Sequence, residues 1–340
     1  MAQKPRIGSL VGSILGTALL LALGWSLVYE YAVKVLLSDG PRRLQEISSL
    51  ELGSTLWWRN FVALAFDVLI IVVAAIGTWW VLASLVAEAR EAGKWRSYYR
   101  SREAQRDRWV ERLTPWQRIQ HLWMMITFIV CAVTGMAAHL DVLASRQTLL
   151  TIHVYSGLAM GVLAVIHFAQ YTTMALLAKA RGESLRERFP MLEIYSRKFI
   201  RGIVKTLLRP FRPGIKPEPF GKYDPEQLFE YWGIYWGMAV LGVPGVALLL
   251  YGPDVLGGLF WVMHFKEAIL AITFILMVHI AYTHFRPTVF PMDPTFIHGK
   301  MPMKRAMEEH PEWARKLAQA QQEQPEEAAS PPEQAAARAP

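Results

Sequence analysis

The sequence predicts an all-α protein that crosses a membrane several times. Of its 340 residues, 53% are hydrophobic and only 19% are charged, and the charges are bunched in a few segments. A soluble domain carries about a quarter charged residues. Several apolar runs are also longer than the roughly 20 residues that a helix needs to cross a bilayer. Together these observations predict a polytopic membrane protein with six transmembrane helices.

Hydropathy sets the bounds of the expected spans. The first apolar run is too long for the hydrophobic region of a cleaved signal peptide, so we interpret it as a span. It contains Gly8, Gly12 and Gly16, a spacing typical of close helix packing, although glycine is also simply common in membrane helices. The six spans are Gly8–Tyr31, Phe61–Val86, Ile119–Leu140, Leu149–Leu177, Tyr231–Tyr251 and Leu259–Tyr282.

The distribution of Lys and Arg predicts the orientation. Nine of these residues lie in the segment 88–118 and twelve in 179–222, whereas only Arg146 lies between the third and fourth spans and none between the fifth and sixth. Cytoplasmic loops carry the excess of positive charge, so we expect both termini in the cytoplasm. This bias explains much of the net charge of +8 without a nucleic-acid partner. The segment from about Gln319 to Pro340 is rich in Ala, Gln, Glu and Pro, and we expect a frayed helix that runs into disorder.

The single cysteine limits the cofactor chemistry. Cys131 lies inside an apolar stretch and has no second thiol with which to form a disulfide or a CxxC metal site. Covalent c-type haem attachment and an iron–sulfur cluster held by this chain alone are therefore excluded.

Histidines at two regular intervals carry the functional signal. His153 and His167 are 14 residues apart on the fourth span, and His264 and His279 are 15 apart on the sixth. At about 1.5 Å per residue each interval is roughly 21–22 Å, and the two histidines of each helix lie within roughly 60° of one face. The two spans run in the same direction, so His153 and His264 share the outer level of the membrane while His167 and His279 share the inner level. Two facing imidazoles are typical of the axial pair of an electron-transfer haem.

The inner level has more than one candidate ligand. His121, near the cytoplasmic start of the third span, competes with His167 as the partner of His279, and His284 is a weaker candidate. For any one membrane histidine, a helix-to-helix hydrogen bond is an equally good explanation. The remaining histidines need no cofactor to explain them: we expect a solvated or capping role for His139 and assign none to His298 and His310.

Glycines and two carboxyl groups complete the candidate site. Glycine lets a flat macrocycle approach a helix backbone, but ordinary helix packing explains any one of these glycines equally well. A quinone site needs a polar group that accepts protons, and Glu230 at the inner level and Glu267 at the outer level are candidates. Their structural alternatives are an ion pair of Glu230 with a loop arginine and a hydrogen bond that orients His264. The glycines are Gly135, Gly157, Gly161, Gly233 and Gly237.

Several motifs resemble a known family. The run Arg118-Ile-Gln-His121-Leu-Trp with Thr134-Gly135 resembles the first core helix of the di-haem cytochrome b subunit of formate dehydrogenases (the gamma subunit) and nickel–iron hydrogenases. His264-Phe-Lys-Glu-Ala268 leading to His279-Ile-Ala-Tyr282 resembles the last core helix of that family. Three shorter motifs resemble the branch associated with multihaem c-type cytochromes: Glu230-Tyr-Trp-Gly233, Phe290-Pro-Met-Asp293 and Glu308-Glu-His-Pro311.

The resemblance, over about 112–315, implies a four-helix cytochrome b bundle with two haem b groups. His153 and His264 would hold the outer haem, and His121 and His279 the inner one. His167 has no counterpart in the formate dehydrogenase pattern, so the inner pairing stays open and a third haem is compatible with the sequence. The resemblance also favours the inner site near Glu230 for the quinone. The two N-terminal spans are additional to the family pattern.

The expected organisation has three parts: an N-terminal two-helix hairpin with a basic loop (1–111), the haem-binding core (112–285) and a cytoplasmic tail (286–340). The expected function is an electron-transfer subunit of a quinone-linked oxidoreductase complex in the bacterial inner membrane. It would connect menaquinone or ubiquinone with a periplasmic multihaem cytochrome c or an iron–sulfur or dehydrogenase subunit. The alternatives are a ferric-reductase-like transmembrane haem carrier and a haem-free transporter or anchor.

Overall fold

The computed structural model describes residues 6–208, 211, 212, 215 and 218–328. The expected fold class is confirmed: the chain is all-α, and the described part contains six helices long and apolar enough to cross a membrane and one pair of three-residue strands. The helical segments that include the spans are Ile7–Ser49, Thr55–Glu91, Pro115–Leu140, Arg146–Ala180, Pro225–Tyr251 and Val255–Thr283.

The first helical segment extends well beyond its expected end. Helix α1 (Ile7–Val28) continues through a π-helical turn, η1 (Tyr29–Val33), into α2 (Lys34–Ser49). Hydropathy falls at Lys34, but α2 is amphipathic and packs on α3 (Thr55–Glu88), where Asn60 donates to Glu46 over 2.7 Å. Tertiary packing therefore keeps the segment helical although its composition does not predict a span.

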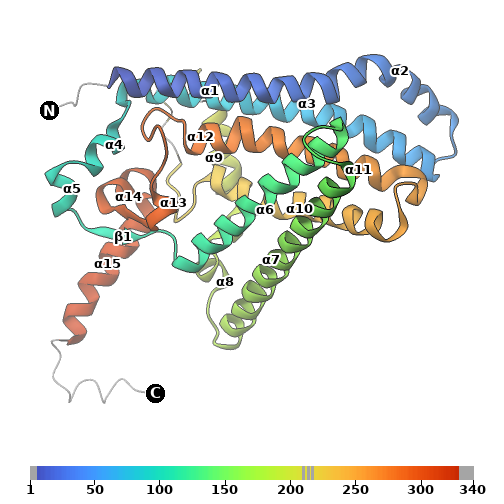
Figure 1. Ribbon diagram of the computed structural model, residues 1–340. Coiled ribbons are helices and arrows are strands. Elements are labelled where there is room, and N and C mark those ends of the chain that lie inside the picture. The colour runs from blue at the N-terminus through green and yellow to red at the C-terminus, as the bar shows by residue number, and fades with distance from the viewer. Residues whose placement is uncertain (1–5, 209–210, 213–214, 216–217, 329–340) are drawn as a thin grey trace.

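Helix α1 packs closely against neighbouring segments at its glycines. Helices α1 and α3 lie side by side along one edge of the molecule, and both contact α11 (Leu259–Phe274) (Figure 1). A Cβ atom added at Gly12 would lie 2.5 Å from Phe290, and one at Gly16 would lie 3.2 Å from Phe285, whereas Gly8 has open space around it. The expected packing role thus holds for Gly12 and Gly16 but not for Gly8.

Helices α6 (Pro115–Leu140) and α7 (Arg146–Ala180), which bear four of the histidines, run obliquely to α1 and α3 (Figure 1). Helix α10 (Pro225–Tyr251) has no histidine and packs against α7 and α11. Helices α6 and α10 begin with the same N-capping arrangement. Thr114 and Asp224 are N-caps that each accept a hydrogen bond from the main-chain N–H three residues later, followed by proline at the first helical position and a reciprocal glutamine. Helix α11 continues through the π-helical turn η5 (Ile275–Ile280) into α12 (Ala281–Thr283). A 3-10 turn, η4 (Val255–Gly258), precedes it.

A cluster of short elements, the cap unit, packs at one end of the spans, beside α4 (Lys94–Tyr99) and α5 (Arg102–Arg106). Strand β1 (Trp109–Glu111) pairs antiparallel with β2 (Lys300–Pro302), so the basic loop and the tail form one unit. Arg305, which is 1% exposed, contacts both Asp293 and Glu309, joining two sequence motifs through one guanidinium group. The unit also includes η2 (Ala89–Glu91), α13 (Thr295–His298), α14 (Met303–Glu309) and α15 (Pro311–Ala328). The expected frayed tail is helical through Ala328, and 329–340 lies outside the described residues.

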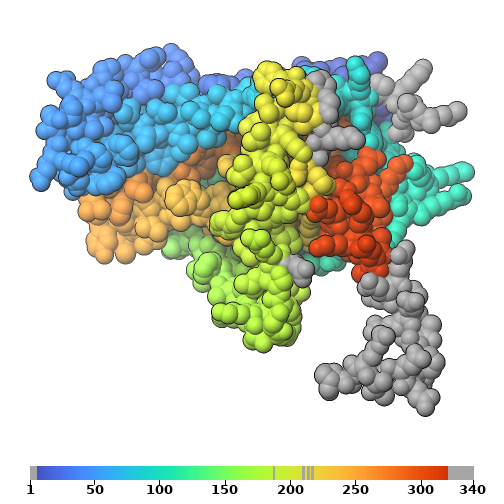
Figure 2. Space-filling view, turned by 180° about the vertical axis from the view of Figure 1, so that it is seen from behind, coloured from blue at the N-terminus to red at the C-terminus, as the bar shows by residue number. Residues whose placement is uncertain are grey.

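Helix α9 (Arg197–Leu208), after α8 (Leu185–Arg188) and η3 (Pro190–Tyr195), crosses the back of the molecule at a steep angle to α1 and α3 (yellow in Figure 2). Its outer face exposes Ile200, Val204 and Leu208 at helical spacing, and Arg201 lies beside them. Its inner face is tightly packed, since a Cβ atom added at Gly202 would lie 2.6 Å from Pro225. This apolar stripe with flanking basic groups is typical of helices that lie in the plane of a membrane interface.

Candidate functional site

The outer histidines face each other across two helices. His153 on α7 and His264 on α11 have ring centres 5.9 Å apart. A metal–imidazole nitrogen bond is about 2 Å long and the ring centre lies about 1.1 Å further, so two rings on one metal have centres about 6 Å apart. The outer pair therefore has the separation that a six-coordinate haem iron requires.

The same local arrangement orients both outer rings. His153 Nδ1 donates to the main-chain carbonyl of Cys131 over 3.0 Å, and His264 Nδ1 donates to that of Leu241 over 2.9 Å. Because a carbonyl only accepts, Nδ1 carries the proton in each ring and Nε2 keeps the lone pair that binds a metal. Each ring lies against the glycine four residues after that carbonyl, where an added Cβ atom would be 3.0 Å from His153 at Gly135 and 3.2 Å from His264 at Gly245.

The inner level brings His121 and His279 together. His121 on α6 and His279 on η5 have ring centres 6.3 Å apart, which again fits two ligands of one metal. Nδ1 of His279 lies 3.1 Å from Oε2 of Glu230 on α10. A carboxylate on the far nitrogen of a ligand imidazole fixes its orientation and raises its basicity. The structure therefore links Glu230 directly to His279 and not to a loop arginine.

His167 does not face His279. Its Nδ1 lies 3.1 Å from Oε1 of Gln120, and its Nε2 lies 3.0 Å from the hydroxyl of Tyr231. The ring is stacked between Tyr171 and Tyr235, with centres 4.4 and 4.8 Å away. Both nitrogens are thus engaged, so the geometry favours His121 over His167 as the partner of His279.

The four remaining histidines lie outside the two facing pairs. His284 lies beyond α12 with its ring centre 6.3 Å from that of His279, and its Nδ1 is buried without a hydrogen-bond partner. Burial and the neighbouring His279 lower the pKa of His284 to about 4. His139 is exposed at the outer end of α6 and contacts Phe265, consistent with the solvated position expected for it. His298 and His310 belong to the cap unit.

Glu267 differs from Glu230. It is 5% exposed on α11, and no hydrogen bond joins it to another described residue. Its carboxylate lies against Gly237 of α10, where an added Cβ atom would be 3.0 Å from Oε1. His264 donates to Leu241 instead, so the expected orienting hydrogen bond from Glu267 to His264 does not form.

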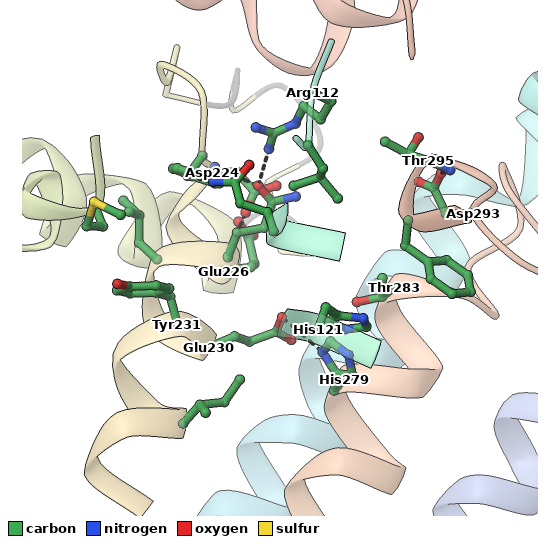
Figure 3. A pocket seen from close by; sticks show the side chains of 18 of the residues that line it. Arg112, His121, Asp224, Glu226, Glu230, Tyr231, His279, Thr283, Asp293 and Thr295 are labelled. Atoms are coloured by element: carbon green, nitrogen blue, oxygen red, sulfur yellow. Dashed lines mark hydrogen bonds and ion pairs between the residues drawn. The ribbon is translucent and has the colours of Figure 1, made fainter. Parts of the chain in front are cut away.

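A cavity of about 350 Å³ adjoins the inner pair. Figure 3 shows Glu230 pointing toward His279 and His121, with Arg112 and Asp224 at the other end of the cavity. Its wall combines residues from α6, α7 and α10 with residues of the cap unit, among them Asp293, Arg305 and His310. The cavity therefore extends from the inner histidines into the cap unit.

Some residues of the candidate site are hard to recognise from the sequence. Gly245 follows Pro244 inside an apolar helix and has no neighbouring polar residue to mark it, so the sequence does not predict its place beside His264. Of the glycines expected to admit a macrocycle, Gly157, Gly161 and Gly233 have open space around an added Cβ atom, whereas Gly135 lies against the ring of His153 and Gly237 against Glu267. Arg112, at the start of the core, looks in the sequence like one more cytoplasmic positive charge.

Fold and site together define an all-α, multi-pass membrane protein with two facing histidine pairs at different levels of the bundle. Among the residues that the structure describes, no group of three or more His, Cys, Asp or Glu side chains is arranged to hold a metal ion, and an axial pair needs only two. No protein-family model matches the sequence, and neither does any curated protein.

Proposed function

We propose that this protein is the b-type cytochrome subunit of a quinone-linked oxidoreductase complex in the bacterial inner membrane. The single observation that carries the proposal is the repetition of one arrangement at two levels, a pair of imidazoles about 6 Å apart. In three of the four rings a hydrogen bond occupies Nδ1 and leaves Nε2 for a metal. Helix packing alone does not require that repetition.

His153 and His264 would hold the outer haem, and His121 and His279 the inner one. When bound, haem would supply reversible one-electron chemistry, and ligation by two histidines would favour electron transfer over oxygen chemistry. The chain itself fixes the ligand rings through the Cys131 and Leu241 carbonyls and through Glu230. Because His264 and His279 are 15 residues apart, the two levels are separated by about 22 Å. That separation covers most of the roughly 30 Å hydrocarbon core, as a transmembrane electron carrier requires.

The quinone substrate, menaquinone or ubiquinone, would react near the inner pair. Support comes from Glu230, whose Oε1 is buried without a hydrogen-bond partner while Oε2 contacts His279, and which lines the cavity. We expect Glu230→Gln to slow quinol-driven haem reduction. Glu267→Gln, at the outer level, serves as the matched variant. An unchanged rate in the first and a slowed rate in the second would move the quinone site to the outer level.

The remaining parts of the proposal rest on the sequence. The positive-inside rule supports cytoplasmic termini, so the outer pair would face the periplasm. There it would exchange electrons with a multihaem cytochrome c, or with an iron–sulfur or dehydrogenase subunit, as the family resemblance suggests.

Haem content decides the proposal. We expect purified full-length protein to show a sharp α-band on reduction and two haem b per chain. Ala variants of His153 or His264 should lose one equivalent, and those of His121 or His279 the other. His139→Ala and His167→Ala are the controls and should retain both. Protein without haem would refute the proposal and leave the transporter or anchor, and a ratio near three would make His167 or His284 a ligand.

A further inference from the structure

Unpartnered hydrogen-bonding groups are concentrated in the wall of the cavity beside the inner histidines. Eight buried side-chain atoms of the described residues lack a hydrogen-bond partner, and seven of them belong to residues that line this cavity. Four of the seven are arginine N–H groups, which can only donate. The wall therefore matches a ligand rich in acceptor oxygens. The seven atoms are Arg112 Nη1, Arg118 Nε, Glu230 Oε1, His284 Nδ1, Arg286 Nε, Arg305 Nε and His310 Nδ1.

Arg112 differs from the other deeply buried arginines of this wall. Arg286 and Arg305 each form ion pairs with carboxylates, and both contact Glu309. Arg112 is 5% exposed, and no carboxylate of a described residue lies within 4.0 Å of it. Its Nη2 donates to neutral Gln227 over 2.7 Å, and its guanidinium lies 4.9 Å from the ring centre of Tyr223. A buried cation without an ion-paired anion is costly, so its site suits an anionic ligand.

Two further basic groups stand close to Arg112. Nζ of Lys222 lies 5.9 Å from the ring centre of Tyr223, over which Arg112 also lies, and burial and the charge of Arg112 lower the pKa of Lys222 to about 8. The same two causes lower the pKa of His310, which is 2% exposed. Asp224, Glu226 and Glu309 also line this wall, where Asp224 caps α10 and Glu309 contacts the other arginines. The charge of Arg112 is thus not neutralised by an ion pair with any described carboxylate.

We propose that the Arg112 corner of the cavity binds a carboxylate group. Two sources have this chemistry. One is the propionate groups of a haem held by His121 and His279 in the same cavity, and this source rests on the proposed function. The other is a free dicarboxylate that enters from the cytoplasm. In both cases Nη1 of Arg112 donates to the carboxylate, Lys222 adds a second positive charge nearby, and the unpartnered Nδ1 of His310 can donate a hydrogen bond.

The first arm of the test is a redox titration of the full-length protein, with Arg112→Gln, Arg112→Lys and the exposed control Arg100→Gln. Loss of a positive charge beside a propionate stabilises oxidised haem. Arg112→Gln should therefore lower the midpoint potential of the inner haem and leave the outer haem unchanged. Arg112→Lys should restore most of the shift, and Arg100→Gln should have no effect. If Arg112→Gln does not accumulate, Lys222→Gln at a half-exposed position replaces it, with a smaller downward shift expected.

The second arm is calorimetric titration of the same preparations with succinate. Binding to the wild type that weakens tenfold or more in Arg112→Gln would identify a free carboxylate as the ligand. A potential shift without succinate binding would identify the propionates. If neither a potential shift nor succinate binding is observed, the proposal is overturned, and ordered water is the partner of these groups. If the purified protein contains no haem, the proposed function is refuted but the carboxylate site is not. The succinate titration then tests the carboxylate site by itself.

Discussion

A buried ion pair joins the N-terminal helices to the helix that carries His264. Asp67 of α3 is fully buried and forms a short ion pair with Lys266 of α11. Arg43 of α2 contacts the other oxygen of Asp67 at 3.0 Å. Lys266 also donates to the main-chain carbonyl of Tyr31 over 2.6 Å. The cluster therefore holds α2, η1, α3 and α11 together only two residues from an outer-level histidine.

We expect Asp67→Asn to be strongly destabilising, because it leaves Lys266 and Arg43 without their shared carboxylate. Removing one partner of a buried ion pair costs about 3–5 kcal/mol of unfolding free energy. Lys266→Met should cost less, since Asp67 keeps Arg43 as its partner. The double variant Asp67→Leu/Lys266→Met should recover only part of the loss, because it replaces two of the charges by apolar groups but leaves Arg43 with Asp39 at 3.8 Å as its remaining partner.

The assay is reversible unfolding in mixed detergent micelles, followed by tryptophan fluorescence. Glu30→Gln is the matched control, because it breaks an exposed ion pair of 2.7 Å with Lys34. Solvent-exposed ion pairs within a helix contribute little to stability, so this control should be close to wild type. If Asp67→Asn were no more destabilising than Glu30→Gln, the reasoning about burial would be wrong.

Three further predictions concern individual residues of the core and the cap. Glu230→Gln removes the negative charge beside a ligand imidazole, so the midpoint potential of the inner haem should rise, and an unchanged potential in a redox titration would contradict its orienting role. Gly245→Val places a Cβ atom 3.2 Å from His264 and should deplete one haem equivalent in optical spectra, whereas Gly242→Val, whose Cβ atom meets nothing within 4 Å, should keep both. Burial raises the pKa of Glu309, but the guanidinium groups beside it outweigh burial and lower the pKa to about 2, below 4.5 in the unfolded chain. Its stabilising contribution is therefore complete above pH 4.5 and lost as the pH falls toward 2. The Glu309→Gln variant should be less stable than the wild type at neutral pH, and its unfolding free energy should not fall in this way between pH 4.5 and 2. If the stability–pH curves of variant and wild type were parallel, the ion pairing of Glu309 would be contradicted.

Local sequence patterns determined the fold class and the two histidine levels. Long apolar runs have only a few stable solutions in a bilayer, and a helix satisfies all its main-chain hydrogen bonds internally. The six spans could therefore be located without a structure, with one exception at Lys34–Ser49, where packing on α3 and not composition keeps the chain helical. The interval between His264 and His279 likewise follows from helix rise alone.

Only the tertiary structure decided which side chains meet. Equal spacing made His167 as good a partner for His279 as His121, but the rotation of α7 turns His167 toward Tyr231, while α6 brings His121 to the ring of His279. The roles of Glu230 and Arg112 could not be predicted from the sequence either, because each depends on a contact with a residue of another element. Periodicity fixes the position of a residue along its own helix, whereas contacts between helices depend on their relative rotation and tilt, which the packing of the whole bundle sets.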